Sequence, residues 1–133
     1  MTSEIRERLI QLAIEARQRA YAPYSNYRVG AALITTSRKY FTGCNVENAA
    51  YPTSLCAERV AVFKAVSEGE REFEAIAVVT SNGGTPCGSC RQVLAEFGLE
   101  TMVIIADTEG KVIQEVQLSE LLPGAFGPAD LVK

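Results

Sequence analysis

The sequence predicts an α/β fold in which helices pack on both faces of a sheet. Three observations support this: an amphipathic segment opens the chain, short apolar segments alternate with helical patterns, and Gly- and Pro-containing turns separate them. With 133 residues, 47% of them hydrophobic and 22% charged, the chain fits one globular domain spanning residues 1–133. No internal repeat or linker-like stretch divides it.

The first half of the chain predicts one helix and a strand pair. Residues 3–20 repeat apolar side chains at helical spacing, with Ser3 as the expected N-cap; the repeated positions are Ile5, Leu9, Leu12, Ala13 and Ala16. Residues 29–36 and 40–46 are rich in apolar and β-branched side chains, and a short polar turn joins them. We therefore expect a first helix followed by a β-hairpin.

The second half continues the alternation of helices and strands. The expected elements are a helix at residues 55–67, a strand at 75–80, a helix at 88–97 and strands at 102–106 and 112–116. Gly69 and Gly98 stand where the two helices should stop, as glycine commonly does after a helix. Five strands and three helices in this order predict a layered α/β structure.

The net charge and the N-terminal segment indicate the cellular location of the protein and the classes of partner it is not expected to bind. The net charge is −3, and the basic residues are scattered, so we expect no nucleic-acid partner. The start, MTSEIRERLIQLAIEARQRA, lacks the features of a signal or transit peptide, and no apolar stretch approaches the roughly 18 residues that cross a bilayer. We expect a cytoplasmic protein with no membrane partner. In that reducing compartment, cysteines are better explained as metal ligands or reactive thiols than as disulfides.

Three of the four cysteines lie where two predicted helices begin. Cys56 falls in the first turn of the helix at 55–67, and Cys87 and Cys90 flank the first turn of the helix at 88–97. Unpaired N–H groups and the positive end of the helix dipole favour the thiolate form at such positions, and the thiolate is the form that binds zinc. The sequence thus predicts a zinc site made by the two helix starts.

The metal site is expected to be catalytic. A structural zinc site closes with four protein ligands, whereas a catalytic one has three and keeps a position for water. The chain contains no His, and Cys44 lies on a predicted strand as a small buried apolar residue. Arg59 and Arg91 follow ligands in sequence, so we predict that they hydrogen-bond to thiolate sulfur; the alternative is that they are solvent-exposed helix arginines.

Glu58 is the candidate proton carrier. A carboxylate beside an activated water can accept its proton and deliver it later to the substrate and leaving group. Residues two apart on a helix normally face opposite ways, so Glu58 can work with Cys56 only because both fall at the helix start. Taken alone, Glu58 would be better explained as a solvated helix residue.

The combined pattern is more specific than any of its parts. Cys-Ala-Glu is followed by Thr-Pro-Cys-Gly-Ser-Cys, with 30 residues between Cys56 and Cys87. This matches the known signature of zinc deaminases, H-x-E followed by P-C-x-x-C, in its three-cysteine form. Over essentially its whole length the sequence resembles the cytidine deaminase family; the matching segments are YAPYSNYRVGAAL, GCNVENAAYPTSLCAERVAVFKAVSEG, TPCGSCRQVLAEF and LLPGAFGPADL.

The resemblance implies a fold, a reaction and a metal. The fold would be a three-layer α/β/α sandwich with a mixed five-stranded sheet. The reaction would be hydrolytic deamination of cytidine and 2′-deoxycytidine to the uridine nucleosides in pyrimidine salvage. One zinc per subunit would be bound by Cys56, Cys87 and Cys90, with Glu58 as the acid/base near ring N3.

It also implies roles around the substrate. Asn45 and Glu47 would hydrogen-bond the ribose 3′-hydroxyl, and Tyr51 would line the 5′-hydroxyl end. The Ala57 backbone N–H would face the pyrimidine O2, and the Thr85 carbonyl would accept from the exocyclic amine. Family members of this length are typically homotetramers in which a phenylalanine, here Phe126, stacks on a base bound by a neighbouring subunit.

The chain departs from the family pattern at two adjacent positions near the substrate. The family usually has Phe followed by Pro where this chain has Tyr27 and Arg28. Tyr27 therefore brings a hydroxyl to an aromatic wall of the expected pocket.

Four other interpretations compete with the deaminase. A redox C-x-x-C motif would leave Cys56 and Glu58 unexplained, and a structural zinc module would need Cys44 as a fourth ligand. A nucleic-acid deaminase should have a basic surface, which the net charge of −3 does not favour. Blasticidin-type deaminases share the metal motif, but Asn45-Val46-Glu47-Asn48 and the LLPGAFGPADL ending fit the cytidine enzymes better.

Overall fold

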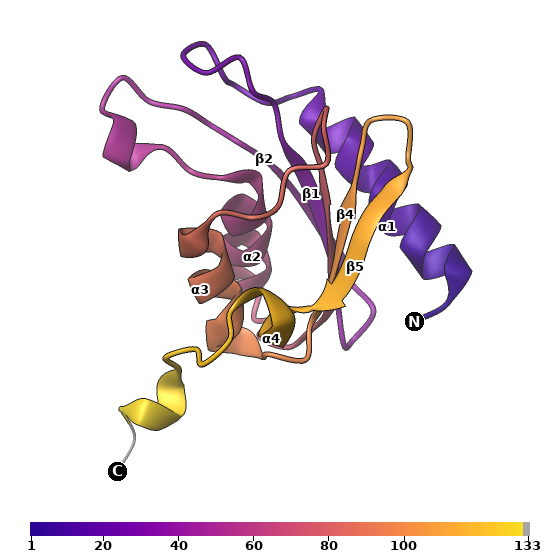
Figure 1. Cartoon of the computed structure of the whole chain (residues 1–133), viewed down its shortest axis with the longest axis vertical. Coiled ribbons are helices and arrows are strands. Elements are labelled where there is room, and N and C mark those ends of the chain that lie inside the picture. Colours follow the sequence, from indigo (N-terminus) through magenta and orange to yellow (C-terminus); the bar gives the residue numbers. More distant parts are fainter. Residues whose placement is uncertain (132–133) are drawn as a thin grey trace.

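The computed structural model describes residues 1–131 and contains a mixed five-stranded sheet (Figure 1). Its strands are β1 (Gly30–Thr35), β2 (Tyr40–Cys44), β3 (Phe73–Val79), β4 (Met102–Ala106) and β5 (Val112–Gln117), in the spatial order β2-β1-β3-β4-β5. β3 and β4 run parallel, and the other neighbouring strands pair antiparallel. The predicted mixed sheet is confirmed.

Helices cover both faces of this sheet. α1 (Ser3–Arg17) lies on one face, and α2 (Ala57–Ser67), α3 (Gly88–Phe97) and the short α4 (Leu118–Leu121) lie on the other (Figure 1). Successive side chains of a strand point to opposite faces. In β3, Ala75 and Ala77 accordingly join the core beneath α1, whereas Ile76 and Val78 join the core beneath α2 and α3. The predicted three-layer α/β/α arrangement is confirmed.

Two glycines allow the helices to approach the sheet closely. A Cβ atom on Gly30 would lie 1.9 Å from the carbonyl oxygen of Ala13 in α1. A Cβ atom on Gly43 of β2 would lie 2.4 Å from the carbonyl oxygen of Ala57 in α2. Any side chain at Gly43 would therefore push the first turn of α2 away from the sheet, and this turn carries Glu58.

The element boundaries differ from the predicted ones where tertiary contacts decide them. α1 ends at Arg17 instead of residue 20, and its N-cap is Thr2, whose Oγ1 accepts from the Ile5 N–H at 3.2 Å. α2 begins at Ala57 instead of residue 55, because Leu55 instead pairs with Val46 in an isolated bridge. Helix 88–97 and strand 102–106 match the prediction, whereas α4 and the 3₁₀ helices at Tyr51–Thr53 and Pro128–Asp130 were not predicted.

None of the helices within residues 1–131 combines the length and the apolar character needed to cross a bilayer.

Candidate active site

The three clustered cysteines are positioned by the starts of α2 and α3. Cys56 is the N-cap of α2 and Cys87 the N-cap of α3, while Cys90 is the third residue of α3. Cys56 therefore precedes the first turn instead of lying within it, because the helix begins two residues later than predicted. An N-cap side chain lies next to the third helical residue, and the Cys87 and Cys90 Sγ atoms are accordingly 3.5 Å apart.

The sulfur geometry fits a tetrahedral zinc ion. The Cys56 and Cys87 Sγ atoms are 3.8 Å apart, and all three Sγ atoms lie within 4.8 Å of one another. Two thiolates on a tetrahedral zinc with Zn–S bonds of about 2.3 Å would be about 3.8 Å apart. Within residues 1–131 the metal-binding group contains these three cysteines and no Cys44, so the structure lacks the fourth ligand that a structural zinc module requires.

Cys56 and Cys90 interact strongly, and their pKa values shift in opposite directions. The hydrogen bond from Cys90, together with the guanidinium of Arg59, lowers the pKa of Cys56 to about 5. The same contact with Cys56, together with burial, raises the pKa of Cys90. Arg59 Nη2 donates to Cys56 Sγ at 3.3 Å, and its buried Nε has no hydrogen-bond partner within the described chain. A guanidinium here offsets negative charge that three thiolates would otherwise leave on the metal site.

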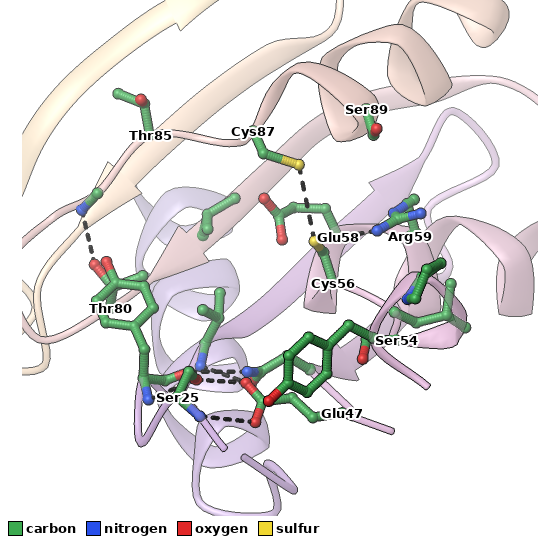
Figure 2. A pocket seen from close by; sticks show the side chains of 18 residues that line it. Ser25, Glu47, Ser54, Cys56, Glu58, Arg59, Thr80, Thr85, Cys87 and Ser89 are labelled. Atoms are coloured by element: carbon green, nitrogen blue, oxygen red, sulfur yellow. Dashed lines mark hydrogen bonds between the residues drawn. The ribbon is translucent and has the colours of Figure 1, made fainter. Parts of the chain in front are cut away.

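Glu58 is buried at the start of α2 yet lines a cavity. It is the second residue of the helix and 4% exposed, and Figure 2 shows it pointing between the sulfurs of Cys56 and Cys87. Burial, and to a lesser extent the negative charge of Cys56, raises the pKa of Glu58 to about 7. A carboxyl group with this pKa can both accept and release a proton near neutral pH, and a divalent cation at the three sulfurs would shift it toward the carboxylate form.

Glu58 and two of the sulfurs form part of the wall of a cavity of about 490 Å³ (Figure 2). Nine of the residues singled out from the sequence line it: Tyr27, Asn45, Glu47, Tyr51, Cys56, Glu58, Arg59, Thr85 and Cys87. Cys90 and Ala57 are fully buried behind this wall. Because Ala57 is the first residue of α2, its backbone N–H has no partner within the helix.

The two residues expected at the ribose are held by the loop before β1. Asn45 Oδ1 accepts from the Val29 N–H at 2.9 Å, and its Nδ2 donates to the Tyr27 carbonyl at 2.8 Å. The Glu47 carboxylate accepts from the Ser25 hydroxyl and from the Tyr24 N–H, and the first of these bonds lowers its pKa. Each side chain keeps further hydrogen-bonding capacity, since an amide has a second N–H and a carboxylate has several lone pairs.

Two aromatic residues expected at the substrate also line the cavity. Tyr51 lies in the 3₁₀ helix Tyr51–Thr53, is 69% exposed, and meets the Tyr24 ring edge-on with ring centroids 5.7 Å apart. The Tyr27 hydroxyl donates to Asn82 Oδ1 at 2.7 Å. The hydroxyl that departs from the family pattern thus has a defined protein partner.

Arg91 and Phe126 are placed differently from the other predicted residues. Arg91 donates to the Pro86 carbonyl at 2.7 Å, to the Leu121 carbonyl at 2.8 Å and to Thr85 Oγ1 at 3.1 Å. These acceptors replace the thiolate sulfur predicted from sequence, because the Thr85–Pro86 and C-terminal segments flank the helix on which Arg91 stands. Phe126 is 55% exposed and lies outside the cavity lining of its own chain.

The structure adds residues that the sequence analysis did not single out. Ser25 holds Glu47, and Thr80 lines the cavity near Asn82, the partner of Tyr27. Thr80 and Asn82 follow the carboxyl end of β3, the end of a strand at which α/β sheets bind ligands, so their position along the chain was a usable signal. Ser25 carries no comparable signal, because its role depends on a contact 22 positions away.

A buried carboxylate and three converging thiols at helix starts, opening on a cavity, together define the class of zinc-dependent hydrolytic deaminases. The redox and structural-zinc interpretations do not explain why Glu58 shares this wall.

Comparison with known proteins identifies the family within this class of zinc-dependent deaminases. Residues 3–106 match the family described as the cytidine and deoxycytidylate deaminase zinc-binding region, and the chain belongs to this family. It is 50% identical over 129 residues to a cytidine deaminase from Halalkalibacterium halodurans, covering 95% of this chain and 97% of the relative. A cytidine deaminase from Sporosarcina psychrophila is 48% identical over 127 residues, covering 94% and 93%. The crystal structure of cytidine deaminase from Burkholderia pseudomallei superposes with a TM-score of 0.86 at 49% identity, covering 95% of this chain and 100% of that chain.

Proposed function

We propose that the protein hydrolyses cytidine and 2′-deoxycytidine to uridine and 2′-deoxyuridine, releasing ammonia, as a step of pyrimidine salvage. The observation that carries this proposal is the position of Glu58, buried beside the three-cysteine cluster in the wall of the cavity. The names of the relatives support the same reaction. Loss of cytidine absorbance on incubation with the purified protein tests it directly.

Cys56, Cys87 and Cys90 are the residues that would hold the zinc ion. When bound, the zinc supplies Lewis-acid activation of a water molecule at neutral pH. Glu58 accepts a proton from that water and gives a proton to ring N3, so that the water oxygen adds to C4. Glu58 then takes the proton of the new C4 hydroxyl and delivers it to the exocyclic nitrogen, so the C4–N bond breaks and ammonia leaves as the C4 carbonyl forms. A pKa near neutrality suits a group that must both take and give protons.

The remaining cavity residues bind and orient the nucleoside. Asn45 and Glu47 are proposed to hold the ribose 3′-hydroxyl, the Ala57 N–H to face O2, and the Thr85 carbonyl to accept from the exocyclic amine. Tyr51 covers the 5′-hydroxyl end, where its exposed ring is available. Sugar contacts of this kind contribute binding energy that bare cytosine cannot supply.

We expect one tightly bound zinc per chain, since three sulfurs converge at one place. Elemental analysis of protein purified without added metal should give close to one equivalent. Full activity at clearly less than one equivalent would contradict the metal-dependent mechanism.

We expect both cytidine and 2′-deoxycytidine to be deaminated, while free cytosine and single-stranded DNA or RNA react poorly. Asn45 and Glu47 are proposed to bind the ribose, which free cytosine lacks. A net charge of −3 does not favour binding of the phosphate backbone of a nucleic acid. Parallel assays with the nucleosides, the base and a cytosine-containing oligonucleotide measure this. Efficient conversion of the oligonucleotide would show that the substrate class is wrong.

We further propose a homotetramer in which Phe126 completes the site of a neighbouring subunit. Its ring is half exposed in a loop rich in Gly and Pro, and it lies outside its own cavity. Covering such a ring against a neighbour's substrate would provide both assembly and base stacking.

Mixing two variants of weak activity tests this sharing. Co-expressed Glu58→Gln and Phe126→Ala chains should form some sites with Glu58 from one chain and Phe126 from another, so activity should rise above that of either parent. Mixing Glu58→Gln with Cys87→Ala is the matched control and should give no gain, because both residues act within one chain. The absence of any gain in the first mixture would place Phe126 in its own chain's site or outside catalysis.

A further inference from the structure

The segment Thr80–Gly84 follows β3 and precedes the cysteines at the start of α3. It contacts two parts of the molecule that are distant in sequence. On one side, Gly83 has φ of 70° and packs against Ile113 of β5, so closely that a Cβ atom would lie 2.5 Å from Ile113 Cγ1. On the other side, the Tyr27 hydroxyl donates to Asn82 Oδ1 at 2.7 Å, across 55 positions of sequence. Tyr27 therefore supports this segment from the cavity side.

The hydroxyl of Tyr27 also fits a space that glycine leaves open. A Cβ atom on Gly84 would lie 2.5 Å from the Tyr27 hydroxyl oxygen. Within the segment, the Gly84 N–H donates to Thr80 Oγ1 at 2.8 Å, and the Thr80 hydroxyl donates to Asn82 Oδ1 at 3.3 Å. Tyr27 thus contacts a segment in which one hydrogen bond joins Gly84 to Thr80 and a second joins Thr80 to the same Asn82 oxygen.

Tyr27 is itself fixed relative to the opposite wall of the cavity. Its N–H donates to Ser25 Oγ at 3.0 Å, and its carbonyl accepts from Asn45 Nδ2 at 2.8 Å. Both Tyr27 and Gly84 line the cavity, so the bond to Asn82 sets how far apart these two wall segments stand. The next residues toward Cys87 have a separate support, because Arg91 holds the Thr85 hydroxyl and the Pro86 carbonyl.

We propose that Tyr27 is a positioning residue whose hydroxyl, through Asn82, fixes the Thr80–Gly84 wall of the cavity and so sets substrate affinity. A phenylalanine, the residue usual in this family, lines the same wall but cannot donate this hydrogen bond. Tyr27 is not among the residues assigned to the reacting atoms above, and Arg91 separately holds Thr85 and Pro86 next to Cys87. We therefore expect the effect on substrate binding and not on turnover or zinc content. The kinetic part of this inference rests on the proposed deamination of cytidine.

The test uses the zinc-loaded protein and three variants: Tyr27→Phe, Asn82→Ala and the double variant. Amide hydrogen exchange should be faster across residues 80–84 in Tyr27→Phe and unchanged across the α3 start. The KM for cytidine should rise about threefold to tenfold with kcat and zinc content unchanged, the range expected for one net hydrogen bond. The double variant should be no worse than either single one. Tyr40→Phe, the same chemical change on β2 outside the cavity, is the matched control and should match wild type.

The outcomes separate this inference from the proposed function. Wild-type exchange at residues 80–84 in Tyr27→Phe overturns the positioning role, whatever the substrate is. Faster exchange with an unchanged KM also overturns it, because the wall would then move without affecting affinity. Additive KM effects in the double variant would mean that Tyr27 and Asn82 act independently. If no protein, including wild type, deaminates cytidine, the exchange data still decide whether the hydroxyl holds the loop.

Discussion

Replacing Glu58 by Gln should abolish most turnover while leaving the fold and the zinc in place. The amide has nearly the same shape as the carboxylate, so the buried position at the start of α2 can accept it. It cannot accept a proton from water or return one to the substrate. A general acid/base group contributes about 10²- to 10⁴-fold to the catalytic rate. Loss of one group that serves several proton transfers should lower kcat by at least that factor. Steady-state kinetics, elemental analysis and circular dichroism on the same sample measure the three properties.

Glu68→Gln provides the matched control for that experiment. Glu68 is an exposed residue at the other end of the same helix, so the substitution makes the same chemical change away from the cavity. Its kinetics should equal those of wild type. A Glu58→Gln enzyme within tenfold of wild type would show that another group carries the protons.

Replacing Cys87 by Ala should remove the zinc and the activity together. Two sulfurs remain in that variant, too few for the three-ligand site described above. Loss of a group that merely supports a ligand costs about 10- to 100-fold, so loss of a ligand should cost more than about 100-fold. Zinc content and kcat/KM, measured after the same purification, should fall in parallel. The fold should persist, because the two apolar cores on either side of the sheet contain neither Cys56 nor Cys87.

Cys44→Ala is the matched control, because it removes a thiol that is not a proposed zinc ligand. Cys44 lies at the end of β2, outside the three-sulfur cluster, and the smaller side chain fits a half-buried strand position. This variant should keep one zinc and full activity. A loss of zinc there would mean that Cys44 takes part in the metal site, and would favour the closed structural site over the catalytic one.

The layered fold could be predicted from sequence because its signals are local. Strand 102–106 is a continuous apolar run, and helix 88–97 ends at Gly98, whose φ of 141° few other residues adopt. The start of α2 was misplaced because Leu55 pairs with Val46, a contact that no local pattern encodes. α4 has four residues, about one turn, and a single turn shows no helical periodicity.

The candidate site was predictable to the extent that its residues are close in sequence. Cys87 and Cys90 are an N-cap and a third helical residue, so their proximity follows from helix geometry alone. The partners of Arg91 could not be found in this way, because Leu121 lies 30 positions further along the chain. The hydrogen bond from Tyr27 to Asn82 joins loops that only the completed sheet brings together.

The attachment of the C-terminal segment to α3 has a mechanical consequence. Consecutive residues of α3, Arg91 and Gln92, hold the carbonyls of Leu121 and Phe126, each at 2.8 Å. In Figure 1 this segment extends away from the sheet below α3. A force applied to the C-terminal end would therefore act on α3, the helix that contains Cys90, before it acted on the strands. Tethering or immobilising the protein through its C-terminus would strain the metal-bearing helix first, whereas attachment at the N-terminus would load α1 on the opposite face of the sheet.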